Sequence, residues 1–234
     1  MAQVCATVVT SSGDGVIEPQ PQDKEWFKRK EWLSFHESLV RRSARRRDTK
    51  VVFLGDSITQ GWLTTGFRHW QKTFSDYQPL NLGIGGDEIQ HLHWRLLNGE
   101  GDDSHPDVVV LLVGTNNIGN AGHSAEQVIE LFEPLLDCIG QKWPSAAKLV
   151  HTIFPRDANP GTPFRKSIAD VNAAIHSWAT SGRFSVLDMT EVFLRDDGTL
   201  PQDDLPDFLH LSERAYGIWA GHLDRAIQRV RDKE

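Results

Sequence analysis

Short apolar runs alternate with longer amphipathic stretches along most of the chain. Runs such as 51–54 and 108–113 are apolar without polar alternation, which is typical of strands buried on both faces of a parallel sheet. In the stretches between, apolar residues recur every three or four positions, which predicts helices. The predicted strands cover 51–54, 80–87 with its terminal glycines, 108–113, 148–154 and 184–189, and the predicted helices cover 24–47, 58–74, 88–97, 125–143, 164–181 and 211–230. This alternation predicts an α/β fold of three layers, a doubly wound parallel sheet of about five strands with helices on both faces.

The chain divides into a polar leader and a single predicted domain. Residues 1–22 are rich in Ser, Gly, Pro and Gln, so we expect a flexible N-terminal arm there. Residues 23–234 are expected to form one domain, which starts with an amphipathic helix. A chain of 234 residues, of which 39% are hydrophobic, is long enough for one sizeable core.

The net charge narrows the classes of partner. A formal charge of −7 argues against general affinity for nucleic acid or for an anionic membrane, because both need a basic surface. No apolar stretch approaches the roughly 18 residues of a membrane span, so membrane insertion is not expected. The first residues lack the basic region and long apolar region of a signal peptide, so we expect a cytoplasmic protein unless a leader has been removed.

Ser57 is the candidate nucleophile. It follows the first apolar run and Gly55, where a parallel strand delivers its next residues to the carboxyl edge of the sheet. A serine after Gly-Asp, taken alone, is more often a helix N-cap than a nucleophile. Asp207 and His210 change that balance, because one short turn can present both side chains between the last strand and the last helix. The backbone N–H groups of Ser57 and Gly86 and the side-chain amide of Asn116, each just after a predicted strand, are the candidate oxyanion donors.

Four blocks of the chain resemble those of the GDSL or SGNH hydrolase family, and they occur in the family's order. Gly55-Asp56-Ser57 matches the first block, Gly86 the second, Gly114-Thr115-Asn116 the third and Asp207-Phe208-Leu209-His210 the fourth. Within the family, 81–87, 94–100 and 114–117 are most similar to the catalytic subunits of intracellular platelet-activating factor acetylhydrolase, and the chain also resembles related bacterial acetyl esterases. The resemblance covers roughly 50–230.

The resemblance implies a flavodoxin-like fold, an esterase that needs no cofactor, and a possible homodimer. It implies Ser57, His210 and Asp207 as a catalytic triad that hydrolyses short acyl esters, with acetylated carbohydrates or small-alcohol esters preferred. Esters of the platelet-activating-factor type and lysophospholipids are the alternative substrates. Ile58, Trp62, Thr115 and Leu209 are candidates for the substrate pocket.

Two further features bear on the function, one that leaves another interpretation open and one that argues against a metal site. The basic run from Arg41 to Arg47 could contact an acidic partner, so a partner-binding module without turnover is the alternative of a different class. His91 and His93 are two residues apart on a predicted helix and therefore lie on different faces, so no metal site is expected there.

Overall fold

The computed structural model describes residues 17–232 and shows five parallel strands in one sheet. The strand order is β2-β1-β3-β4-β5, so the chain starts one strand in from the edge, adds β2 at that edge, and then reverses direction to place β3 on the other side of β1. This is the doubly wound, flavodoxin-like order, and it confirms the predicted fold class. The reversal places the switch point of the topology between β1 and β3, where such sheets bind ligands.

The strands and helices fall close to the predicted ranges. The strands are β1 (Val51–Gly55), β2 (Leu80–Gly83), β3 (Val108–Leu112), β4 (Ala147–His151) and β5 (Ser185–Leu187). The helices are α1 (Arg29–Ala44), α2 (Ser57–Gln60), α3 (Phe67–Phe74), α4 (Ile89–Leu97), α5 (Thr115–Gly119), α6 (Ala125–Lys142), α7 (Pro163–Ala179), α8 (Thr190–Phe193) and α9 (Glu213–Arg231), with 3-10 turns η1 (Gly61–Leu63) and η2 (Ser75–Tyr77).

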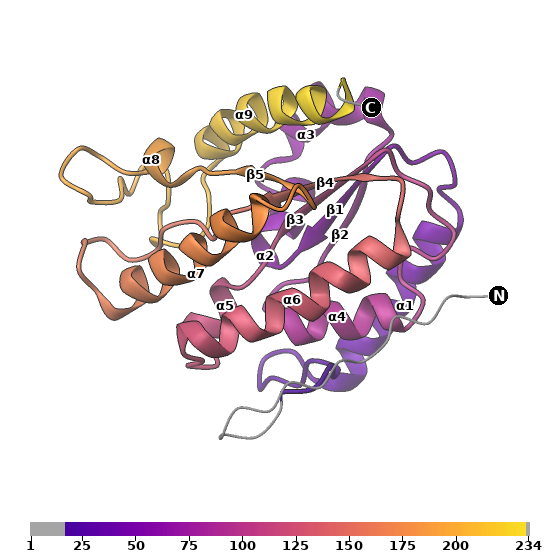
Figure 1. Cartoon of the computed structure of the whole chain (residues 1–234), viewed down its shortest axis with the longest axis horizontal. Coiled ribbons are helices and arrows are strands. Elements are labelled where there is room, and N and C mark those ends of the chain that lie inside the picture. The colour runs from indigo at the N-terminus through magenta and orange to yellow at the C-terminus, as the bar shows by residue number, and fades with distance from the viewer. Residues whose placement is uncertain (1–16, 233–234) are drawn as a thin grey trace.

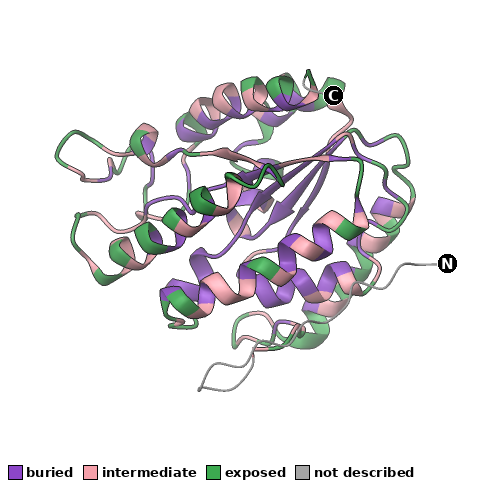
Figure 2. Cartoon of the chain, viewed as in Figure 1, coloured by how far each residue is buried: buried purple, intermediate pink, exposed green. Residues whose placement is uncertain are grey.

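Two hydrophobic cores lie on opposite faces of the sheet. Successive strand residues point to opposite faces, so Val52 and Leu54 join one core while Val51 and Phe53 join the other. Figure 1 shows α1, α4, α6 and α7 over one face and α3 and α9 over the other. Strands β1, β2 and β3 are buried along their whole length, β5 is half-buried, and the outer helix surfaces are exposed (Figure 2). Double coverage is the reason that the central strands β1 and β3 carry no polar side chain.

The region predicted as one helix over 58–74 is broken into α2, η1 and α3. Gly61 and Gly66 account for the break, because the side chain of Tyr216 on α9 packs against both. A Cβ at Gly61 would lie 2.0 Å from the Tyr216 hydroxyl, and one at Gly66 would lie 2.7 Å from its ring. That hydroxyl donates a hydrogen bond to the carbonyl of Ile58, 2.7 Å away. The break therefore lets α9 approach the segment that follows Ser57.

The structure describes only the last part of the predicted N-terminal arm, 1–22. Most of the predicted arm, 1–16, lies outside the described residues. Gln22, which the prediction assigns to the arm, has no exposed surface. The next residues form a tight turn closed by two backbone hydrogen bonds between Lys24 and Phe27, and α1 begins only at Arg29.

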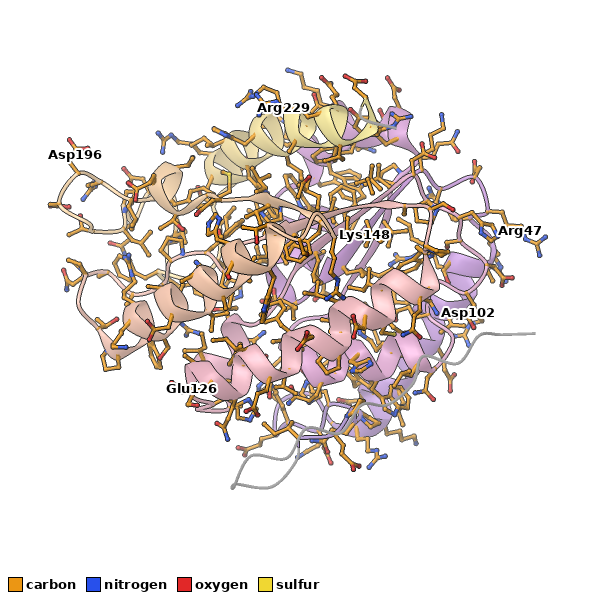
Figure 3. All side chains as sticks on the ribbon, in the orientation of Figure 1. Arg47, Asp102, Glu126, Lys148, Asp196 and Arg229 are labelled. Carbon is orange, nitrogen blue, oxygen red and sulfur yellow. The ribbon has the colours of Figure 1, made fainter. Side chains whose placement is uncertain are left out.

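The basic run lies at the end of the sheet away from the carboxyl edge, because it connects α1 to the first residue of β1. Arg42 donates a 2.6 Å hydrogen bond to the carbonyl of Asn81, and Arg41 pairs with Glu37. Arg47 is exposed and points away from the body of the protein (Figure 3). Within residues 17–232, no helix combines the length and apolar character needed to cross a membrane.

Candidate active site

The predicted site residues meet at the carboxyl edge of the central strands. Ser57 follows β1, Gly86 follows β2 and Asn116 follows β3, and these three strands are neighbours in the sheet. The register pairs Gly55 with both Gly83 and Leu112, so the three strands end at the same level. The loops that follow the three strands therefore bring Ser57, Gly86 and Asn116 to the same edge of the sheet.

Ser57, His210 and Asp207 form one hydrogen-bonded chain. Ser57 Oγ lies 2.9 Å from His210 Nε2, and His210 Nδ1 lies 2.7 Å from Asp207 Oδ2. Ser57 is the first residue of α2, and it is half-buried, whereas His210 is exposed. In this arrangement, the ring nitrogen facing the carboxylate carries the proton, and the other nitrogen can accept the serine proton.

The loop that carries His210 is shaped by the aspartate itself. Asp207 Oδ1 accepts hydrogen bonds from the backbone N–H groups of Leu209, 3.1 Å away, and His210, 2.7 Å away. Phe208, which lies between Asp207 and Leu209, has a φ of 58°, which is an unusual conformation for a bulky residue. Burial by itself would raise the pKa of Asp207, but the hydrogen bonds from His210 and Leu209 outweigh it and hold the pKa below its usual range. The carboxylate thus stays charged beside the imidazole.

The β2–α4 connection brings Gly86 to the site in a tight turn. Asp87 N–H donates to the Ile84 carbonyl at 3.2 Å, and Gly86 has a φ of 78°, the value that the third position of a type II turn requires. A Cβ on the preceding Gly85 would lie 3.9 Å from Ser57 Cβ, so this turn runs directly beside the nucleophile candidate.

Asn116 is held between two hydrogen bonds. Its side-chain nitrogen donates to the carbonyl of Asp87 at 2.9 Å, and its side-chain oxygen accepts from Asn120 at 2.9 Å. An amide nitrogen carries two hydrogens, so Asn116 keeps one for a further acceptor. The side chain is 3% exposed, which fixes its orientation.

Most of the chain matches the model of one known protein family. The model of the GDSL-like lipase/acylhydrolase family matches residues 53–218, which include all five predicted catalytic and oxyanion residues. The chain belongs to this family. The family assignment makes the protein an ester hydrolase.

This GDSL hydrolase also has similar relatives among studied proteins. It is 38% identical over 187 residues to platelet-activating factor acetylhydrolase IB subunit alpha1 of Homo sapiens, a match that covers 79% of this chain and 78% of the relative. Its fold is similar to a GDSL-like lipase from Bacteroides thetaiotaomicron, with a TM-score of 0.69, 17% identity, and coverage of 83% and 97% of the two chains. An acetylxylan esterase from Geobacillus stearothermophilus has a TM-score of 0.61 at 20% identity, with coverage of 76% and 94%.

The four pocket candidates of this GDSL hydrolase differ in exposure, and three of them are buried. Trp62 is 0% exposed and packs against Tyr216 and Trp219, with ring centroids 4.7 and 4.6 Å away. Ile58 is 2% exposed in the same core. Both side chains therefore belong to the same hydrophobic core as the buried face of α9. Thr115 is also buried, and Arg156 donates to its carbonyl at 3.0 Å, while Leu209 keeps partial exposure beside His210.

Two histidines that the sequence singles out are buried and uncharged near neutral pH. Burial lowers the pKa of both His91 and His93 to about 4. His91 Nδ1 accepts a hydrogen bond from the backbone N–H of Glu88 at 3.0 Å, which caps the start of α4. In the described part of the chain, no group of three or more His, Cys, Asp or Glu side chains could hold a metal ion.

A buried charge network below the site was missed by sequence reasoning. The N-cap residue of α4 is Glu88, and Asp87 precedes it. Asp87 instead points inward, 2.8 Å from Arg95 Nε, and accepts a 2.8 Å hydrogen bond from the Trp32 indole. Arg95 also pairs with Glu100, and all three charged side chains have no exposed surface.

Arg95 connects this network to two strand ends. It donates to the carbonyls of Leu82 at 2.7 Å and Gly55 at 3.1 Å. Arg95 therefore holds together the ends of β1 and β2, from which the Ser57 and Gly86 turns leave the sheet. One sequence signal could have revealed this buried network. It is an arginine on the inward face of a predicted amphipathic helix that has acidic residues near both ends.

Asp56, the residue before Ser57, is a buried carboxylate with one unsatisfied oxygen. Oδ1 accepts from the backbone N–H of Ile58 at 2.9 Å and caps α2, whereas Oδ2 is buried without a hydrogen-bond partner in the described structure. Burial raises the pKa of Asp56 to about 6, against the opposing attraction of His210 and Lys24. The charged form of Asp56 therefore costs stability at neutral pH.

The substitution Asp56→Asn should raise the free energy of unfolding at pH 8 by about 1–3 kcal/mol, because it removes that buried charge. The gain should shrink as the pH falls through 6 toward 4. In that range, folded wild-type Asp56 takes up a proton while its unfolded form, with a pKa of about 3.9, stays charged. Urea unfolding at pH 8 and pH 4.5 measures both values. The exposed Asp76→Asn serves as control, and an equal effect of Asp56→Asn at the two pH values would contradict the expectation.

Proposed function

We propose that this ester hydrolase works through an acyl-enzyme on Ser57. His210 Nε2 takes the Ser57 proton as Oγ attacks the acyl carbon, and the same proton passes to the departing alcohol oxygen when the ester bond breaks. Water then attacks the acyl-enzyme, gives a proton to His210 and releases the acid, and Ser57 recovers its proton. Asp207 orients the imidazole and stabilises its protonated form. The 2.9 Å contact between Ser57 Oγ and His210 Nε2 is the observation that carries this proposal.

The developing oxyanion requires donors on the side of Ser57 away from His210. We assign this role to the backbone N–H groups of Ser57 and Gly86 and to the free hydrogen of the Asn116 amide. Each is fixed before substrate arrives, by α2, by the Ile84–Asp87 turn and by the Asp87 carbonyl respectively. Fixed donors cost no reorganisation during the reaction, and each contributes about 3–4 kcal/mol to the stabilisation of the transition state.

The acyl group that fits best is short, with acetyl first. Three of the four pocket candidates, Ile58, Trp62 and Thr115, are at most 4% exposed. Ile58 and Trp62 are packed into the hydrophobic core, so neither side chain provides an open apolar surface beside Ser57 for a long acyl chain. The acetyl-ester names of relatives and fold neighbours agree with this assignment.

A series of p-nitrophenyl esters tests the acyl preference. We expect kcat/KM to fall at least about tenfold from acetate to octanoate, because each misplaced methylene group carries a cost of up to about 1–3 kcal/mol. Initial rates with acetate, butyrate, hexanoate and octanoate measure it. A rate that rises with chain length would overturn the short-acyl assignment and favour a lipase or lysophospholipase.

For the alcohol part of the substrate, there are two candidates. Acetylated carbohydrates or small alcohols are one, and acetyl esters of glycerophospholipids are the other. The 38% identity to platelet-activating factor acetylhydrolase over most of both chains favours the second. Comparing kcat/KM for an acetylated xylo-oligosaccharide with that for an acetyl-glycerophosphocholine ether decides between them. The homodimer stays a prediction, with the subunit names of the relatives in its favour.

A further inference from the structure

The segment Gln22–Phe27 packs against the turn that carries Gly86, although more than 60 residues separate them in the chain. Lys24 Nζ donates a 2.6 Å hydrogen bond to the Gly86 carbonyl and lies 3.0 Å from the Glu88 carboxylate. The Lys24 side chain is 16% exposed, so this bond is largely shielded from water. A short bond from an ammonium group to a carbonyl is stronger than one between neutral groups.

Trp26 and Gln22 cover the same glycine. A Cβ on Gly86 would lie 2.7 Å from the Trp26 ring and 3.0 Å from the Gln22 side-chain oxygen. Trp26 stacks on Phe27 with ring centroids 5.9 Å apart, and the backbone bonds between Lys24 and Phe27 close the turn that presents it. The segment therefore packs directly against the Cα of Gly86. A side chain at position 86 would displace Trp26 and Gln22.

The Gly86 turn needs such support, because two successive glycines give it more backbone freedom than other residues would. Three bonds hold it in place. Gly85 N–H donates to Gln60 Oε1 at 2.8 Å, Asp87 N–H donates to Ile84 within the turn, and Lys24 holds the Gly86 carbonyl. Gln60 is on α2 and fixes the turn to the Ser57 side, whereas Lys24 fixes it from the opposite end of the glycine pair.

We propose that Lys24 is a positioning residue for the oxyanion site: it holds Gly86 in the orientation that points its N–H at the substrate oxyanion. The inference rests on the proposed role of Gly86 as a donor. Its ammonium charge also reaches the neighbourhood of the nucleophile, because Lys24 is one of the groups that act electrostatically on Asp56. The N-terminal turn before α1 is therefore part of the active site.

The test compares Lys24→Met, Lys24→Arg and Lys142→Met in the full-length enzyme. Lys142 is a matched control, because it also donates to a backbone carbonyl, that of Leu96 at 3.0 Å, and pairs with a carboxylate, that of Asp102. It lies at the end of α6, near the amino ends of the strands.

We expect Lys24→Met to lower kcat for p-nitrophenyl acetate by about 10–100-fold, up to the effect of losing one oxyanion donor, with less than about threefold change in KM. Lys24→Arg should recover most of kcat, and Lys142→Met should keep the wild-type value.

A transition-state analogue separates positioning from folding. A short trifluoromethyl ketone forms a tetrahedral adduct with serine, so its inhibition constant should rise in Lys24→Met by the same factor as kcat/KM falls. Rates are expressed per active site, titrated with a fluorophosphonate, so that unfolded protein does not count. Wild-type kcat in Lys24→Met, or a loss of kcat with an unchanged inhibition constant, would overturn the inference. Full activity of Ser57→Ala would instead overturn the proposed function, so the two failures are distinguishable.

Discussion

Replacing Ser57 by alanine is expected to lower kcat for p-nitrophenyl acetate by about 10⁴-fold or more, because no other group supplies the attacking oxygen. KM should change little, since the binding contacts and the oxyanion donors remain. The free energy of unfolding should change by less than about 1.5 kcal/mol, because only the hydrogen bond to His210 is lost. If the acyl-enzyme forms faster than it is hydrolysed, the wild-type enzyme releases a rapid first burst of p-nitrophenol in stopped-flow kinetics. Ser57→Ala should abolish this burst.

Ser181→Ala is the matched control for this experiment. The Ser181 hydroxyl donates to the Trp178 carbonyl at 2.7 Å, just after α7, and takes no part in the site. It should retain the wild-type rate. Substantial turnover by Ser57→Ala would exclude the acyl-enzyme on this residue and with it the proposed mechanism.

The second large effect concerns stability. Arg95→Met is expected to lower the free energy of unfolding by about 3–5 kcal/mol, because it leaves two buried carboxylates, Asp87 and Glu100, without their cation. The carbonyls of Gly55 and Leu82 lose their donor as well. Urea unfolding followed by tryptophan fluorescence measures the change.

The control is the exposed pair of Arg183 and Asp137, whose side chains are 44% and 45% exposed. Arg183→Met should cost less than about 1 kcal/mol, because water screens exposed ion pairs. Adding Glu100→Gln to Arg95→Met should recover part of the loss, since one unpaired charge is then removed. A stability within about 1 kcal/mol of wild type for Arg95→Met would contradict a structural role for the network.

Prediction succeeded where the signal is local or where it repeats along the chain. Uninterrupted apolar runs predicted β1 and β3, and the alternation of apolar runs with amphipathic stretches predicted the doubly wound sheet of five strands that the structure shows. The spacing of Asp207 and His210 predicted that one turn presents both side chains. In the structure, Asp207 Oδ2 lies 2.7 Å from His210 Nδ1. The single helix predicted over 58–74 was wrong, because the glycines that admit Tyr216 act through a partner on α9, about 150 residues later.

The sequence by itself determined the fold class, the family and the identity of the candidate triad, because hydrophobic period and short motifs are properties of neighbouring residues. Only the tertiary structure decided which polar side chains are buried and what they contact. Trp62 follows Ser57 closely yet belongs to the core, and Asp87 caps no helix but binds Arg95. Lys24 reaches Gly86 across 62 positions. Such contacts depend on how the helices pack over the sheet, and no local pattern encodes that packing.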